Sequence, residues 1–198
     1  GDKAFVSGSD IEQFVGLKKD EAYEQAVDRI FASLQELPMP TIAVIEGLAV
    51  GSGLLMATAC DFRISTPQAR FGIPVAKTLG NCLSPSNLNW ICAHLGIPMV
   101  KKMLLSAELV MAPELLETGF LYQTADASEI TEAANTLAKK LAALAPMTQK
   151  SSKLGIARLL RHNLPDCTDL MRETYNSQDF REGVNAFLEG RSPQWKGK

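Results

Sequence analysis

Residues 42–53 read IAVIEGLAVGSG, which predicts a buried β-strand, a glycine-rich turn and then a helix. The strand, at 41–45, is apolar and rich in β-branched side chains, and Pro38 and Pro40 bound it on the N-terminal side. The small residues at 51–53 let another group approach the backbone closely. Because the first amides of a helix have no partner within it, this turn offers donors to a developing negative charge. A tight turn with glycine present for steric reasons alone is the alternative.

A second stretch of this kind, residues 3–11, reads KAFVSGSDI. It predicts a short strand that ends in a turn of small residues, and Asp10 is placed to cap the next element. An oxyanion hole needs two backbone N–H groups aimed at one oxygen. The two turns together can supply one N–H each.

Five motifs in this order resemble the crotonase (enoyl-CoA hydratase/isomerase) superfamily. They are the two turns, the strand CDFRIS at 60–65, the segment ARFGIP at 69–74 and the C-terminal stretch DFREGVNAFLEGR at 179–191. The resemblance covers almost the whole chain. It implies an α/β fold built as a crotonase-like spiral of strand–strand–helix units with a C-terminal helical region. It also leads us to expect that N-terminal units of the family pattern are missing.

The composition argues against several other classes of protein. The 198 residues carry a net charge of −2, and no basic stripe suggests binding to nucleic acid. No apolar run reaches the length of a membrane span, and the N-terminus shows no signal-peptide pattern. The 4 cysteines form no C-x-x-C pair, and the 2 histidines have no ligand partner at helical spacing. We therefore expect reduced thiols, a cytoplasmic location and no bound metal.

Hydrophobic periodicity and turn residues divide the chain into two regions. The first, 1–125, alternates strands and helices and is predicted to be the α/β core. The first of its further elements is a helix at 20–37, whose apolar residues Tyr23, Ala26, Ile30, Phe31 and Leu34 follow a period close to 3.6. The others are a buried helix at 52–59, strands at 61–65, 69–72 and 120–123, and helices at 85–94, 98–105 and 113–118. The second region, 126–198, is helical, with helices predicted at 128–144, 146–161, 167–177 and 179–189. Ser84 and Ser128 are the expected N-caps of two of these helices.

The resemblance also implies an assembly. In the crotonase superfamily the C-terminal helical region packs against neighbouring subunits. We therefore expect 126–198 to be an oligomerisation region, in a homotrimer or a dimer of trimers.

The resemblance places the two oxyanion donors on the backbone N–H groups of Ser9 and Ser52. Backbone donors survive a change of side chain, so serine is tolerable at position 52, where the family most often has glycine. Such a pair can stabilise a thioester enolate by several kcal/mol. For both serines, a plain turn residue is the alternative.

The two glutamates that hydratases of this family use are absent at the matching positions. The first, two residues after the last glycine of the second turn, is replaced by Leu55, and the second by Val75. Hydration of a double bond needs a base for water and an acid for the α-carbon. The sequence therefore argues against classical hydration and favours another enolate reaction, such as thioester hydrolysis or decarboxylation. A catalytically silent paralogue that binds acyl-CoA, or only assembles with partners, is the alternative.

One loop holds the polar residues that could replace these acids, namely Asn81, Cys82 and Ser84. Cys82 could be activated at a helix N-terminus. In the simpler interpretation, Ser84 caps the helix and Asn81 completes a turn. Glu114 and Glu117 are the nearest remaining acids, and their helix positions favour a solvated face.

For the coenzyme, the resemblance implies contacts beside the first turn and in the last helix. The backbone carbonyls of Ser7 and Ser9 would read the adenine amine, and Lys3 would lie near the phosphates. Phe187 matches an aromatic residue that reaches the coenzyme of a neighbouring subunit. Arg191 lies next to the position of a basic residue of the family and is its candidate substitute. Coenzyme A would enter as part of an acyl-CoA substrate, with no permanently bound cofactor.

Overall fold

The structure, a computed structural model, describes residues 4–8 and 20–197, and within them short strands form two sheets. One sheet has the order β1 (Ala4–Val6), β3 (Leu48–Val50), β5 (Arg70–Gly72) and β6 (Val110–Met111). The other has the order β2 (Ile42–Ile45), β4 (Phe62–Ser65) and β7 (Gln123–Thr124). Neighbouring strands are parallel, except for β5 and β6, which are antiparallel.

The chain passes repeatedly from one sheet to the other. After β2 it enters β3 of the other sheet, continues through helix α2 (Ser52–Ala59), and returns through β4 to β5. Parallel neighbours such as β3 and β5 cannot be joined by a hairpin, so the helix and the intervening strand make the crossover. This path is the spiral of strand–strand–helix units that the sequence predicted, and the prediction of the fold class is confirmed.

Three strands differ from the sequence-based expectation. The chain forms β3 where a continuous turn was expected, because Gly47, at φ 72°, turns it from β2 directly into the sheet that also contains β1, β5 and β6. The strand expected at 120–123 begins later, as β7, because Phe120 and Leu121 are buried in the core before it. The two-residue strand β6 was not predicted, and it is too short to show a period.

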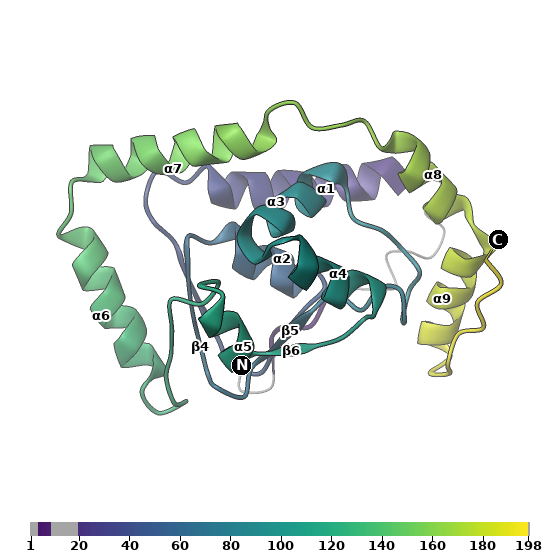
Figure 1. The fold of residues 1–198 in the computed structure, drawn as a ribbon, viewed down its shortest axis with the longest axis horizontal. Helices are drawn as coiled ribbons and strands as arrows, with labels where there is room; N and C mark the ends of the chain where they lie inside the picture. The colour runs from purple at the N-terminus through teal and green to yellow at the C-terminus, as the bar shows by residue number, and fades with distance from the viewer. Residues whose placement is uncertain (1–3, 9–19, 198) are drawn as a thin grey trace.

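Helices surround the sheets (Figure 1). They are α1 (Asp20–Gln35), α3 (Pro85–Leu95), α4 (Ile97–Leu105), α5 (Ala112–Glu117), α6 (Ile130–Ala142), α7 (Pro146–Arg161), α8 (Thr168–Asn176) and α9 (Gln178–Leu188). Figure 1 shows α7 running beside α1, with α6 at one end of the molecule and α8 and α9 at the other. The helical region after 125 therefore wraps around the core. No helix within the described residues is both long and apolar enough to cross a membrane.

Helix α2 lies at the centre of the core, which explains its uniformly apolar sequence. Its C-terminal carbonyls are held by the buried guanidinium of Arg63 on β4. Nη1 of Arg63 donates to the carbonyl of Cys60 at 2.6 Å and Nε donates to the carbonyl of Phe120 at 2.6 Å. A cation at a helix C-terminus also interacts favourably with the negative end of the helix dipole. The CDFRIS motif is thus explained by structure, because its arginine ties the end of α2 to the sheet.

Two details of the predicted helices need correction. In α1, Phe31 and Leu34 pack into the core as predicted, and Glu24 and Val27 share their face. Ile30, which was also expected on the apolar face, is 59% exposed. Helix α6 begins at Ile130 after a turn in which the carbonyl of residue 126 accepts the first hydrogen bonds, so Ser128 does not cap it. The predicted cap of α3 is confirmed, since the hydroxyl of Ser84 accepts the N–H of Asn87 at 3.2 Å.

Candidate active site

The two small-residue turns meet at a cavity of about 170 Å³. Ser7 and Gly8 line it from the first turn, and Gly51 and Ser52 line it from the second. The turns are in close contact, because a Cβ atom added to Gly51 would lie 3.7 Å from the Cα of Gly8. Ser9, the other predicted donor, lies outside the described residues.

The second turn needs its glycines for definite reasons. Gly51 precedes α2 with φ 60° and ψ −123°, a conformation that side chains disfavour. At Gly53, a Cβ atom would lie 2.0 Å from the carbonyl oxygen of Val6, so β1 packs directly against α2. Ser52 is therefore the first residue of a helix held tightly at the cavity, and its amide N–H has no acceptor within that helix.

Leu55 and Val75 both line the same cavity. Leu55 lies in the first turn of α2, three residues after Ser52, and Val75 follows Pro74 after β5. The two positions at which the resemblance expects glutamates therefore present apolar side chains to the cavity. Neither can hold or transfer a proton.

Glu24 of α1, which is not among the residues predicted from the sequence, also lines the cavity. Its side chain is buried, with 3% of the residue exposed. The hydroxyl of Tyr175 on α8 donates a hydrogen bond to its Oε1, and the N–H of Ser84 donates to its Oε2 at 3.3 Å. One signal in the sequence pointed to it, because Glu24 shares a helix face with Val27 and Phe31 at helical spacing.

Burial dominates the electrostatics of Glu24. It raises the pKa of the carboxyl to about 7, although the hydrogen bond from Tyr175 acts in the opposite direction. Nearby Asp28 adds to the rise. Burial and the neighbouring carboxylate also raise the pKa of Tyr175, so its hydroxyl keeps its proton and acts as a donor.

The three loop residues proposed as replacements have different surroundings. Asn81 lines the cavity, and its Oδ1 is buried without a hydrogen-bond partner among the described residues. Cys82 packs against Tyr175 and Phe180, and burial raises the pKa of its thiol to about 11, which disfavours the thiolate that a nucleophile needs. The hydroxyl of Ser84 is engaged, because it caps α3 and donates to the Oδ1 of Asp28 at 2.6 Å.

Known proteins of one family resemble this chain in sequence. A sequence model described as enoyl-CoA hydratase/isomerase matches residues 1–198. The chain is 28% identical over 197 residues to a short-chain-enoyl-CoA hydratase of Clostridium acetobutylicum, covering 96% of this chain and 75% of that protein. It is 31% identical over 205 residues to the (E)-benzylidenesuccinyl-CoA hydratase of Thauera aromatica, covering 100% of this chain and 78% of that one. The chain belongs to the enoyl-CoA hydratase/isomerase family.

A solved structure supports the fold of this enoyl-CoA hydratase/isomerase family member. A methylmalonyl-CoA decarboxylase in complex with 2-nitronate-propionyl-CoA superposes with a TM-score of 0.89 at 24% sequence identity, covering 96% of this chain and 76% of that one. At this level of identity the likeness concerns the fold alone. The family membership relates the chain to enzymes that act on CoA thioesters.

The expected coenzyme contacts of the family are only partly within the described residues. Ser7 lines the cavity, and Lys3 lies outside the described part. Phe187 of α9 is 53% exposed and lines the cavity of its own chain, whereas the resemblance placed it at a neighbouring subunit's coenzyme. Helix α9 can fold back in this way because Gly183 touches the loop, where a Cβ atom would lie 2.2 Å from the carbonyl oxygen of Leu79.

Arg191 is not placed at this cavity. Its Nη1 donates to Glu182 at 2.5 Å and its Nε donates to Glu189 at 2.5 Å. These partners raise the pKa of Arg191, and its contact lowers the pKa of Glu182 to about 2. Two carboxylates already neutralise the guanidinium that the resemblance made a candidate for coenzyme binding.

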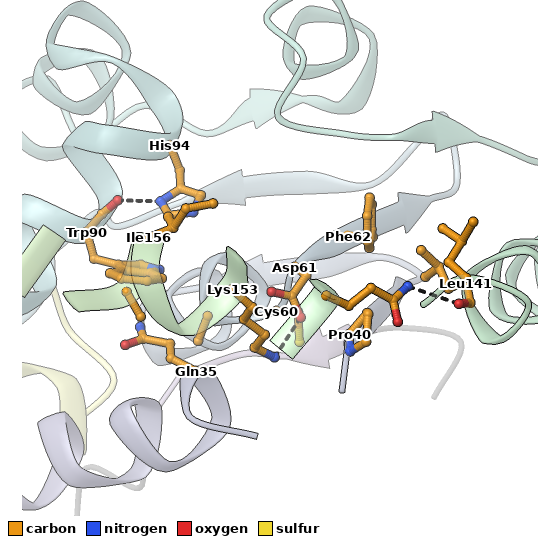
Figure 2. Close-up of a pocket in the computed structure, with 14 residues that line it drawn as sticks. Gln35, Pro40, Cys60, Asp61, Phe62, Trp90, His94, Leu141, Lys153 and Ile156 are labelled. Atoms are coloured by element: carbon orange, nitrogen blue, oxygen red, sulfur yellow. Dashed lines mark hydrogen bonds and ion pairs between the residues drawn. The ribbon is translucent and has the colours of Figure 1, made fainter. Parts of the chain in front are cut away.

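A larger cavity, of about 410 Å³, lies between α7 and the end of α2 (Figure 2). Lys153 of α7 and Asp61 pair within it at 2.7 Å, and Asp61 also accepts the N–H of Thr41 at 2.7 Å. His94 stacks against Trp90, and burial lowers the pKa of its ring, which favours the neutral form. The charges in this cavity are therefore paired in the packing of α7, and the smaller cavity remains the candidate active site.

Proposed function

We propose that the protein binds an acyl-CoA thioester in the smaller cavity and stabilises its enolate with backbone N–H groups. The observation that supports this most directly is the meeting of the two turns at one cavity, with Ser52 as the first residue of α2. A negative charge on the thioester oxygen would be placed at a helix N-terminus, where amide donors and the helix dipole both favour it. Ser9 would supply the second N–H.

The walls of the cavity bear on the type of reaction. Leu55 and Val75 leave no carboxylates at the positions that hydratases of the family use. Addition of water needs both a base and an acid in place, so we expect slow or absent hydration of crotonyl-CoA. Reactions that need no addition of water across a double bond fit these walls better. They are α-proton exchange and decarboxylation, which pass through the enolate, and thioester hydrolysis, in which the same N–H groups would stabilise the tetrahedral oxyanion.

The backbone donor of Ser52 can be tested by removing it without moving the helix. Proline is well tolerated as the first residue of a helix and lacks an N–H, so Ser52→Pro deletes the donor with little cost to the fold. Ser52→Ala keeps the N–H and is the matched control. We expect Ser52→Pro to lower the rate of α-proton exchange by about 100- to 1,000-fold, with Ser52→Ala near the unmodified protein.

The measurement is deuterium exchange at the α-carbon of butyryl-CoA by the complete protein, with butyryl-CoA binding followed by calorimetry. Equal rates for the two serine variants would refute the oxyanion role of Ser52. Rapid hydration of crotonyl-CoA by the unmodified protein would show that Leu55 and Val75 do not mark the acid–base positions.

A catalytically silent paralogue is the second candidate, favoured by the apolar residues at 55 and 75. Such a protein would bind acyl-CoA in the same cavity and leave it unchanged. Binding of butyryl-CoA without exchange, hydrolysis or hydration is the result that this alternative predicts.

A further inference from the structure

We propose that Glu24 is the catalytic acid–base group of the cavity and that Tyr175 positions it. The inference rests on the proposed acyl-CoA function, and it assigns the proton transfer to a helix that none of the recognised motifs includes. Among the described residues that line the cavity, Glu24 is the one with an ionisable side chain. An enolate reaction in this cavity has no other described carboxyl, imidazole or amine to receive the proton.

The position of Glu24 is held from two other elements. Tyr175, on α8, donates to Oε1, and the backbone of Ser84, at the start of α3, donates to Oε2. Tyr175 is itself fixed by packing edge-on against Phe180, with ring centroids 4.9 Å apart. A buried carboxyl held by two donors has a fixed direction, which proton transfer to a bound substrate requires.

The surroundings keep both protonation states accessible near neutral pH. Burial disfavours the carboxylate, and Asp28 on the same helix adds to that effect. Tyr175, from α8, and the Ser84 N–H favour the carboxylate. Cys82, from the loop, faces the pair as a neutral thiol. A group that titrates close to the working pH can act as a base in one direction and an acid in the other.

The reaction assigned to Glu24 is a simple proton transfer. The Glu24 carboxylate removes a proton from the α-carbon of the thioester, and the electron pair of that C–H bond moves into the enolate. The charge rests on the thioester oxygen at the Ser52 amide. In the return step the protonated Glu24 gives its proton back to carbon, and the enolate collapses to the thioester. One carboxyl is sufficient for this exchange, whereas hydration would need a second group.

The test compares Glu24→Gln with Glu36→Gln in the complete protein. Glu36 follows α1 immediately and forms a surface ion pair with Arg161, so its substitution makes the same change of charge outside the cavity. We expect Glu24→Gln to lower the α-deuterium exchange of butyryl-CoA by at least about 100-fold, while calorimetry shows butyryl-CoA still bound. Glu36→Gln is expected to exchange at the unmodified rate.

Tyr175→Phe tests the positioning role by its pH profile. The hydroxyl of Tyr175 favours the ionised carboxyl, so its loss raises the pKa of Glu24. In a plot of exchange rate against pH, the rising limb then moves to higher pH. A purely structural tyrosine would lower the rate at all pH values and leave the limb in place. This variant also tests the proposal if Glu24→Gln does not fold.

The outcomes separate the two proposals. Binding and undiminished exchange in Glu24→Gln would overturn the role of Glu24 and leave the enolate function intact. An unmoved pH limb in Tyr175→Phe would overturn the role of Tyr175. Binding without any exchange by the unmodified protein would overturn both catalytic proposals in favour of the silent paralogue. Absence of butyryl-CoA binding would overturn the acyl-CoA function itself.

Discussion

Glu24 occupies a place where an apolar residue would have packed more easily. It lies on the buried face of α1 with Val27 and Phe31, and its carboxyl is removed from water. Isolated buried carboxylates are costly, and the two hydrogen bonds from Tyr175 and Ser84 offset only part of that cost. A residue retained against such a cost is a candidate for function.

The cost predicts how stability depends on pH. The pKa of Glu24 is raised from 4.5 to about 7 in the folded protein, so the folded state binds this proton more tightly than the unfolded state. The stabilisation that this bound proton gives the folded state is fully present below 4.5, the pKa of the carboxyl in the unfolded chain. It is lost as the pH rises from there toward 7. The loss is at most about 3 kcal/mol of unfolding free energy.

Urea unfolding of the unmodified protein and Glu24→Gln, across this pH range, measures the loss. We expect the difference in unfolding free energy between the two proteins to shift in favour of the glutamine variant as pH rises from about 4.5 to 7. Glu36→Gln is the control and is expected to show no such shift. A constant difference between Glu24→Gln and the unmodified protein would mean that folding does not raise the pKa of Glu24.

At the scale of elements, α9 packs against the loop before α3. Gly183 places α9 against the carbonyl of Leu79, and Gly80, at φ 70°, lies beneath Trp195 of the C-terminal segment. This contact brings Phe187 to the cavity and packs Tyr175 and Phe180 around Cys82. The C-terminal helices therefore form part of the site.

Gly183→Ala should separate α9 from the loop. The added Cβ atom would meet a backbone oxygen at 2.2 Å, and a backbone atom cannot rotate away. We expect a loss of about 1–3 kcal/mol in unfolding free energy by urea denaturation. Gly155→Ala, in α7, is the matched control, because nothing lies within 4 Å of its Cβ position. It should gain about 0.5–1 kcal/mol, as alanine generally does in a helix. Equal effects of the two substitutions would contradict this packing.

At the scale of the whole molecule, the C-terminal helices wrap around the core as one continuous set (Figure 1). Helix α6 buries Ile130 and Leu137 against the sheet of β2, β4 and β7. Other apolar side chains face outward, among them Leu105 at 76% and Leu159 at 76% exposed. These two side chains, on α4 and α7, are candidates for contacts with further copies of the chain.

From the family resemblance, we propose that the protein assembles as a trimer or a dimer of trimers. Light scattering after size exclusion measures the mass in solution. Leu105→Glu and Leu159→Glu, on separate helices, test which exposed surface is used, because a charge placed in an interface core opposes association. A stable monomer at all concentrations would contradict the assembly.

The sequence by itself determined most of the strands and helices, and the family. Its local signals were strong, because Gly and Pro mark element ends and the apolar period distinguishes strands from helices. Helix α7 is found at the predicted residues, as is the cap at Ser84. The two turns were recognised from equally local signals, since small residues at the start of a helix allow a close approach to its backbone.

Only the tertiary structure brought Glu24 and Tyr175 together. They lie 151 residues apart in the chain, so no local period relates them. A glutamate in a helix is usually solvated, and the helix face that is buried depends on what packs against it. The burial that raises the pKa of Glu24 arises from the packing of α1 with α8 and the loop before α3. Local chemistry fixed the elements, whereas the proposed chemistry of the site depends on contacts between distant parts of the chain.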